Sequence, residues 1–212
     1  YVYDRDPTLS TWSRSAKLHA NDMDVGNYFG SGVGVYEDWV VSSAVNDYET
    51  GLRSGSAYMF KKTTGAWSQQ QKLMAADLIY WQPERDWAKY ETILGVKHFA
   101  ESVSMYEDTL ALGVRRSDSS EQLTDGVYIY TGYEENLRWS VQQRLFTSTS
   151  DVGTEETVTG TTARLFPEGS LVAVTDAIND AGNAYVFKRF SGGWTIQQKI
   201  SPVDAFDEID GG

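Results

Sequence analysis

Residues 55–73 read GSAYMFKKTTGAWSQQQKL, and this stretch decides the fold. A Gly-Ser turn leads into a Tyr-Met-Phe alternation, and a second turn leads into Trp67 and the closing pair Lys72 and Leu73. Alternation with a period of two residues between Gly-containing turns is typical of β-strands joined as a hairpin. We therefore expect Trp67, Gln69, Gln71 and Leu73 to project to one face of a strand and Lys72 to the other.

This pattern occurs four times along the chain. Each time a tryptophan is followed after five residues by Lys or Arg and after six by Leu or Ile; the tryptophans are Trp12, Trp67, Trp139 and Trp194. Aromatic alternations precede them at residues 1–3, 58–60, 128–130 and 185–187, and the tryptophans lie 55, 72 and 55 residues apart. Two further short apolar runs lie between each tryptophan and the next alternation. Four short strands per unit of ~50 residues predict an all-β fold built of β-propeller blades, because a sandwich needs no internal repeat.

Together these motifs resemble the FG-GAP repeats of the integrin-α-like propeller family, over almost the whole chain. The matching segments are Phe29-Gly30, Gly55-Ser56-Ala57-Tyr58, Ser102-Val103, Ala184-Tyr185-Val186-Phe187 and the four tryptophan units. In that family the inner strand of a blade comes first and the tryptophan strand last. The resemblance therefore implies a half blade at about 1–18, blades at about 24–73, 92–145 and 156–200, and a linker tail at 201–212.

These ranges make a single propeller segment of about three and a half blades. A closed propeller contains four to eight blades. We therefore expect further blades to come from the same chain or from another chain, and the sequence to be part of a longer one.

Many family members carry a calcium loop rich in aspartate between the first two strands of a blade. The equivalent turns here, at residues 36–38, 106–108 and 166–169, hold too few carboxylates for an ion that takes six to eight oxygen ligands. We therefore do not expect the family's calcium site. Other acidic turns remain candidates for Ca²⁺, and the alternative is that they are plain solvated turns. They contain Asp22 and Asp24 before the first inner strand, Asp176, Asn179 and Asp180 between blade strands, and Asp204, Asp207, Glu208 and Asp210 in the tail.

An insertion at residues 79–90 makes the middle repeat longer than the others. It combines aromatic and charged side chains, and the candidate partner-binding residues are Tyr80, Trp81, Arg85, Trp87 and Tyr90. Aromatic residues with Arg are typical of recognition hot spots, here for a protein or glycan ligand. The alternative is that the loop folds back and covers its own apolar surface.

The composition narrows the class of partner. The net charge of −12 disfavours nucleic acid and anionic membranes as partners, and no apolar run is long enough to span a bilayer. Cysteine is absent, and no catalytic or nucleotide-binding motif accompanies His19, His98 or the glycine-rich residues 30–34, which we expect inside a closely packed strand.

The sequence therefore predicts a non-enzymatic interaction and adhesion scaffold, extracellular or at the cell surface. A lumenal or assembly-bound structural subunit and a polysaccharide-active propeller remain alternatives.

Overall fold

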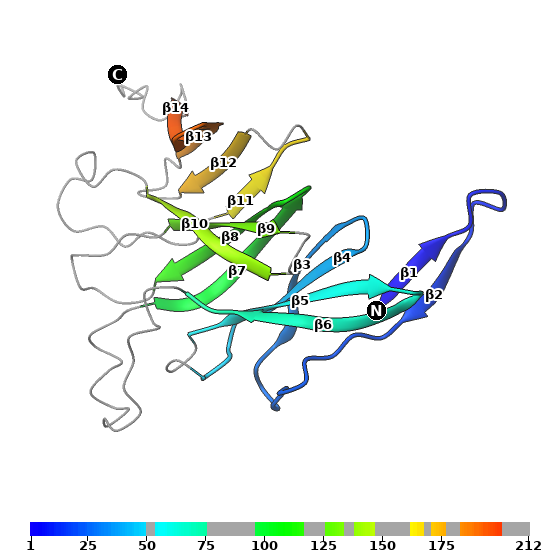
Figure 1. Ribbon diagram of the computed structural model, residues 1–212. Helices are drawn as coiled ribbons and strands as arrows, with labels where there is room; N and C mark the ends of the chain where they lie inside the picture. Colours follow the sequence, from blue (N-terminus) through cyan, green and yellow to red (C-terminus); the bar gives the residue numbers. More distant parts are fainter. Residues whose placement is uncertain are drawn as a thin grey trace, which may run out of the picture.

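A computed structural model describes residues 1–49, 54–75, 96–116, 126–133, 138–146, 162–167, 171–176 and 183–200. All regular elements in these residues are β-strands, which form one hairpin and three four-stranded antiparallel sheets (Figure 1). The hairpin, here called the half blade, consists of β1 (Val2–Arg5) and β2 (Trp12–Ala16). Blade A consists of β3 (Phe29–Tyr36), β4 (Trp39–Ala44), β5 (Ser56–Thr63) and β6 (Ala66–Leu73). Blade B consists of β7 (Val96–Tyr106), β8 (Thr109–Arg116), β9 (Gly126–Tyr133) and β10 (Arg138–Phe146). Blade C consists of β11 (Thr162–Leu165), β12 (Leu171–Asp176), β13 (Asn183–Phe190) and β14 (Gly193–Ile200).

Each four-stranded sheet is a meander in which every strand pairs with the next one along the chain. The sheets lie side by side, and none of the described sheets closes on itself (Figure 1). The prediction of an all-β chain with propeller-type blades is therefore confirmed.

The first two strands of blades A and B are joined by two-residue turns. These turns are Glu37-Asp38 and Glu107-Asp108, and each glutamate has a φ of +49°. Each of these two turns offers only two carboxylates, whereas Ca²⁺ takes six to eight oxygen ligands.

A β-bulge interrupts every tryptophan strand at the third residue after the tryptophan. The bulged residues are Ser15, Gln70, Gln142 and Gln197. Because a bulge inserts one extra residue, side chains beyond it change face. Trp67 consequently packs beside Phe60 toward the half blade, whereas Leu73 packs beside Met59 toward blade B. The expectation that Trp67 and Leu73 share a face is therefore wrong, since residue alternation alone does not reveal a bulge.

The apolar core lies between sheets, in three layers. The first layer joins the half blade to blade A, the second joins A to B and the third joins B to C. In blades A and B an inner phenylalanine meets the first tyrosine of the third strand edge to face. The ring centroids are 5.7 Å apart for Phe29 and Tyr58 and 5.4 Å apart for Phe99 and Tyr128. Each blade thus buries both of its faces only when a neighbour lies on each side.

Glycines in β3 allow the inner strands of neighbouring blades to approach closely. A Cβ atom on Gly32 would lie 3.0 Å from a Val103 methyl carbon, and one on Gly34 would lie 3.1 Å from the other. The expected packing role of the glycine-rich stretch is confirmed at these two positions.

A pair of glycine substitutions tests how tightly blades A and B are packed. Gly55 has a φ of +81°, and a Cβ atom there would lie 2.6 Å from the main-chain N and O of Phe99 in blade B. Gly65 has a φ of +84° but would place its Cβ in open space. We expect Gly65→Ala to cost about 1–2 kcal/mol through backbone strain alone. We expect Gly55→Ala to cost at least twice as much, because main-chain atoms must also move. Urea unfolding measures both, and equal losses would contradict the packing.

Candidate functional site

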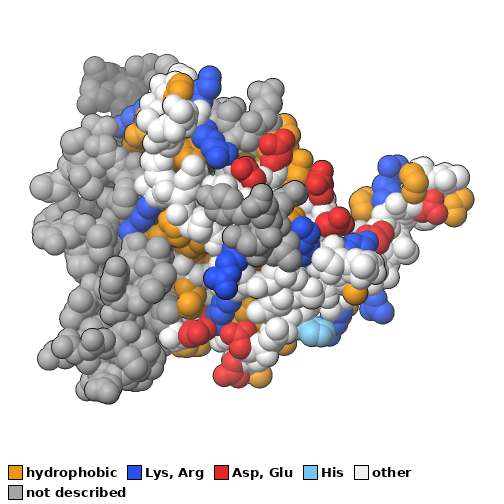
Figure 2. Space-filling view, in the orientation of Figure 1, with side chains coloured by type: hydrophobic (Ala, Val, Ile, Leu, Met, Phe, Trp, Pro, Cys, Tyr) orange, Lys and Arg blue, Asp and Glu red, His pale blue; other side chains and the backbone are white. Residues whose placement is uncertain are grey.

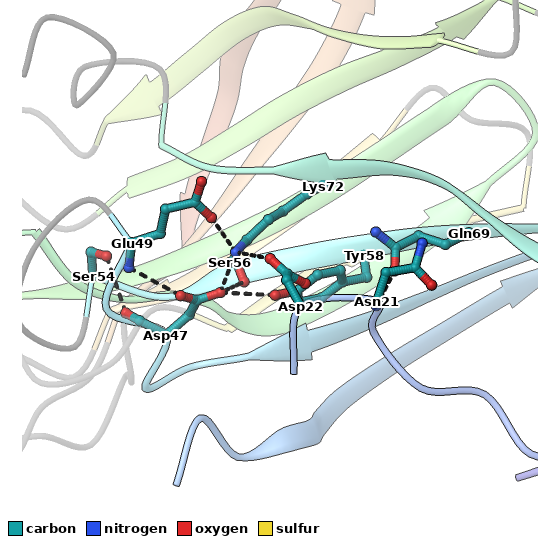
Figure 3. Close-up of polar contacts among 9 residues, drawn as sticks. All are labelled: Asn21, Asp22, Asp47, Glu49, Ser54, Ser56, Tyr58, Gln69 and Lys72. Carbon is teal, nitrogen blue, oxygen red and sulfur yellow. Dashed lines mark hydrogen bonds and ion pairs between the residues drawn. The ribbon is translucent and has the colours of Figure 1, made fainter. Parts of the chain in front are cut away.

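Charged side chains converge on Lys72 near the end of β6. The Lys72 ammonium lies 2.6 Å from an Asp22 carboxylate oxygen and 2.8 Å from one of Asp47, and it also contacts the Glu49 carboxylate. Figure 3 shows the four side chains pointing toward one another from β6, from the loop after β2 and from the loop after β4. We call these four residues the Lys72 cluster.

The bulge in β6 and the pairing of β5 with β6 place Lys72 within this cluster. Lys72 pairs with Tyr58 across the two strands, and its Nζ atom lies 5.2 Å from the centroid of the Tyr58 ring. The Tyr58 hydroxyl donates a hydrogen bond of 2.9 Å to the Asp47 carboxylate, and the Ser56 hydroxyl donates one of 2.7 Å to the same oxygen. Asp47 is therefore surrounded by donors and is buried among them.

The main chain of Asp47 connects the cluster to blade B. Its carbonyl accepts hydrogen bonds of 3.1 Å from the Gly55 N–H and from the Ser54 hydroxyl. The Ser54 carbonyl in turn accepts a 2.9 Å hydrogen bond from the N–H of Phe99 on β7. The cluster therefore stabilises the loop on which blade B packs.

The cluster holds its ionisable groups in fixed protonation states. Burial alone would lower the pKa of Lys72, but hydrogen bonds to Asp22, Asp47 and Glu49 outweigh it and raise that pKa. Burial alone would raise the pKa of Asp47, but hydrogen bonds from Lys72, Ser56 and Tyr58 and from the Glu49 N–H lower it below 3.8. Burial, with the nearby Asp47 charge, raises the pKa of Tyr58 to about 12.

The arrangement offers three carboxylate oxygens within 4.8 Å of one another, from Asp22, Asp47 and Glu49. Oxygens this close can hold a divalent cation, although Ca²⁺ takes six to eight of them. Here the Lys72 ammonium contacts all three carboxylates and supplies the positive charge instead. The cluster is therefore suited to hold the fold together without a metal ion.

Among the side chains that the structure describes, one of the sequence-predicted cation ligands lies in this cluster and another does not. Asp22 is part of it, whereas the Asp24 carboxylate accepts a 2.7 Å hydrogen bond from the N–H of Val25 in its own turn. Asp176 ends β12, and the structure describes its main chain only. Asn179 and Asp180, and the tail residues Asp204, Asp207, Glu208 and Asp210, lie outside the described residues.

Sequence reasoning missed Asp47 and Glu49. The signal that could have found them is the acidic loop directly after β4, because an antiparallel meander brings the end of its second strand to the same edge of the sheet as the end of its fourth. The repeated basic residue was a further signal. In all four units a basic side chain lies over a tyrosine ring; the pairs are Lys17–Tyr1, Lys72–Tyr58, Arg144–Tyr128 and Lys199–Tyr185.

The predicted partner-binding residues Tyr80, Trp81, Arg85, Trp87 and Tyr90 lie outside the described residues. The structure does describe the start of the connection that carries them. The Tyr130 hydroxyl of blade B donates a 2.8 Å hydrogen bond to the carbonyl of Met74, and Ala75 is fully buried. The connection between β6 and β7 is therefore held firmly against blade B where it leaves β6.

Replacing Lys72 tests the structural role of the cluster. Lys72→Met keeps most of the side-chain volume but leaves the buried Asp47 without its cation, so we expect a loss of about 3 kcal/mol in the free energy of unfolding. The matched control is Lys62→Met, which removes the more exposed pair with Asp4 at 3.2 Å and the contact of the ammonium with the Trp67 ring, and it should cost less than about 1 kcal/mol. Added Ca²⁺ should raise the melting temperature of Lys72→Met more than that of the unaltered chain. Equal stability losses in the two variants would contradict the assigned role.

The pH dependence of stability tests the same cluster. Because the pKa of Asp47 is lowered in the folded state, its ionised carboxylate stabilises the fold fully above pH 3.8. This stabilisation is lost as the pH falls through the folded-state pKa. Because the pKa of Tyr58 is raised to about 12 in the folded state, its protonated hydroxyl stabilises the fold fully below pH 10.0. This stabilisation is lost as the pH rises toward 12. We expect Asp47→Asn to make the free energy of unfolding depend less on pH at both the acid and the alkaline end. The substitution removes the charge that is lost in acid, and that same charge helps to keep Tyr58 protonated. Urea midpoints measured from pH 2 to pH 12 test this expectation, and an unchanged pH dependence in the variant would refute it.

Comparison with known proteins identifies one segment of the chain. Residues 12–60 match the family model described as FG-GAP repeat, which here spans β2 to most of β5. Among curated proteins, none matches the chain. The matched segment contains Phe29-Gly30 and the Gly55-Ser56-Ala57-Tyr58 strand start on which the resemblance was based. Residues 12–60 are therefore an FG-GAP repeat, and blades B and C share its strand order and the bulge of its tryptophan strand.

Proposed function

We propose that the chain is a non-enzymatic protein-interaction and adhesion scaffold of the FG-GAP propeller type. The observation that carries the proposal is the FG-GAP repeat at residues 12–60, which is built into a row of blades that pack face against face. Such a row offers a rigid frame, and the loops between its blades tolerate changes in sequence and length. A propeller alone does not specify an activity, so the proposal depends on which loop has the composition of a binding site.

The insertion between β6 and β7 is the loop that we assign to partner binding. It combines Trp81, Trp87 and Arg85, the residue types that contribute most to binding energy in protein interfaces. The chain that leads to it is held at Met74 by the hydrogen bond from Tyr130 and at Ala75 by burial, and a fixed starting point lowers the entropy cost of presenting a loop. A protein ligand fits these residues, and a glycan that stacks on the tryptophans is the other candidate.

The charge of the chain adds one property of the partner. With a net charge of −12, the chain attracts partners that present basic surfaces and repels acidic ones. Asp22 and Glu49 are half exposed and lie close to Lys72, near the end of β6, so they add negative charge where the connection toward the insertion begins. We therefore expect binding to weaken as the salt concentration rises.

We place this scaffold outside the cell or at the cell surface, as its resemblance to the integrin-α-like family suggests. Among the described residues there is no helix of sufficient length and apolar character to cross a membrane. Immunolabelling of intact and permeabilised cells tests the location, and labelling only after permeabilisation would contradict it.

The double substitution Trp81→Ala with Trp87→Ala tests the assigned binding loop. We expect at least a tenfold loss of partner binding with little change in melting temperature, because hot-spot aromatics contribute to the interface and not to the frame. The matched control is Phe190→Ala, which removes an exposed aromatic side chain from the hairpin between β13 and β14 and should leave binding unchanged. Capture from native extract, identification by mass spectrometry and titration of the purified partner provide the measurement, and a glycan array covers a carbohydrate ligand.

Two outcomes would contradict this assignment. The first is a large loss of stability in the double variant with binding intact, which would mean that the insertion covers its own apolar surface. The second is turnover of a polysaccharide by the unaltered chain, which would identify an enzyme.

A further inference from the structure

The turn between the first two strands carries the same three residues in blades A and B. The sequence reads Tyr-Glu-Asp at residues 36–38 and again at residues 106–108, and both glutamates have a φ of +49°. In each turn the carbonyl of the aspartate accepts a main-chain hydrogen bond from the third strand of the blade. The donors are the N–H of Lys62 at 2.8 Å and the N–H of Gly132 at 2.7 Å. The two turns are therefore built alike.

The tyrosines of the two turns meet at the junction of blades A and B. The ring centroids of Tyr36 and Tyr106 are 5.2 Å apart with an angle of 61° between the rings, and both side chains are partly exposed. Burial raises the pKa of Tyr36, and the charges of Glu37 and Glu107 raise it further, so carboxylates of both blades lie near its hydroxyl. We call these two tyrosines and two glutamates the turn site.

Three of the four carboxylates in these turns form no ion pair with a described residue. They are those of Glu37, Asp38 and Glu107, and all three residues are exposed. The fourth, Asp108, lies 3.4 Å from the Arg189 guanidinium of blade C. Figure 2 shows acidic side chains following one another along the edge where Figure 1 places the β3–β4 and β7–β8 turns. This edge therefore carries negative charge that the described part of the fold does not balance.

The Lys72 cluster shows what a set of such groups binds in this protein. There the Lys72 ammonium lies 5.2 Å from the centroid of the Tyr58 ring and contacts all three carboxylates of the cluster. The turn site offers groups of the same kind, tyrosine rings beside carboxylates, but no described residue supplies an ammonium to it. Because both aromatic rings and carboxylates attract a cation, the turn site is suited to receive one from outside the chain.

We propose that the turn site binds a lysine side chain of a partner protein. The ammonium bonds the Glu37 and Glu107 carboxylates, and the methylene groups of the lysine lie along the tyrosine pair. Lysine is the occupant because its ammonium is the group that the molecule itself places beside a tyrosine ring and carboxylates at Lys72. A lysine here contacts two blades at once, so its binding also strengthens their junction.

The position of the turn site separates it from the binding loop assigned above. The site lies where β3 ends and β4 begins, whereas the connection to the insertion leaves the sheet at the end of β6, on the opposite edge. It lies between two described blades, and blades join through their sheet faces and not through the ends of their strands. The site therefore depends on the junction of blades A and B, and not on what adjoins either end of the row.

Fluorine NMR of the chain labelled with 3-fluorotyrosine tests the turn site. Titration with the capped peptide Gly-Lys-Gly should shift the signals of Tyr36 and Tyr106 saturably, and the same peptide with an acetylated lysine should not. We expect Glu107→Gln to raise the dissociation constant about fivefold, because one charge-assisted hydrogen bond is lost. The matched control is Asp24→Asn, which removes an exposed carboxylate from the opposite edge and should leave the dissociation constant unchanged. Both substitutions change the net charge equally, and both replace exposed side chains, so both variants should fold.

Three results would overturn the proposal. If the two tyrosine signals show no saturable shift with the lysine peptide, the turn site does not bind it. Equal effects of Glu107→Gln and Asp24→Asn would mean that the peptide is attracted by the net charge of the chain and not by this site. Equal shifts with the acetylated peptide would mean that the ammonium is not the group that is recognised.

Discussion

The β-bulge of the tryptophan strand lets each blade pack on both of its faces. One extra residue turns the tryptophan toward the preceding blade and the following glutamine and aliphatic residue toward the next blade. Without it, Trp67 and Leu73 would share a face, and one face of each blade would lose its largest side chains. The bulge thus converts an ordinary hairpin strand into one that packs on both sides.

Two glutamine clasps give this packing its register: the Gln71 amide bonds the main-chain N–H and carbonyl of Trp139, and the Gln143 amide bonds those of Trp194. Apolar burial is the larger stabilising term but has no direction. Each clasp adds two hydrogen bonds worth about 0.5–1.5 kcal/mol apiece, and a shift of one residue would break both. Because the amide binds main-chain groups, the clasp depends on where the tryptophan strand lies and not on its side chains. The aromatic layer can therefore vary between blades while the spacing of the blades stays the same.

The repeat was sufficient to predict the all-β fold, the strand order and the propeller-type blades, because period-two alternation and turn residues are local signals. It was not sufficient for the bulge, since Gln70 looks like any other position of the strand until its partner strand is known. The Lys72 cluster was also missed, because Asp47, Glu49 and Asp22 come from two loops that only the folded meander brings to Lys72. Composition could suggest the insertion as a binding loop, whereas its contacts depend on packing that no local pattern encodes.

The interface between the half blade and blade A shows what replaces a missing clasp. Ala16 stands where the other units have glutamine, so this position offers no side-chain amide to the Trp67 main chain. Lys72 bonds Asp22 there, Lys62 bonds Asp4, and the Asn21 N–H donates a 2.9 Å hydrogen bond to the Gln69 side chain. Ion pairs of exposed carboxylates weaken as the salt concentration rises, whereas hydrogen bonds between an amide and the main chain do not. The stability of the row therefore depends on salt at the junction of the half blade with blade A and much less at the junctions between complete blades.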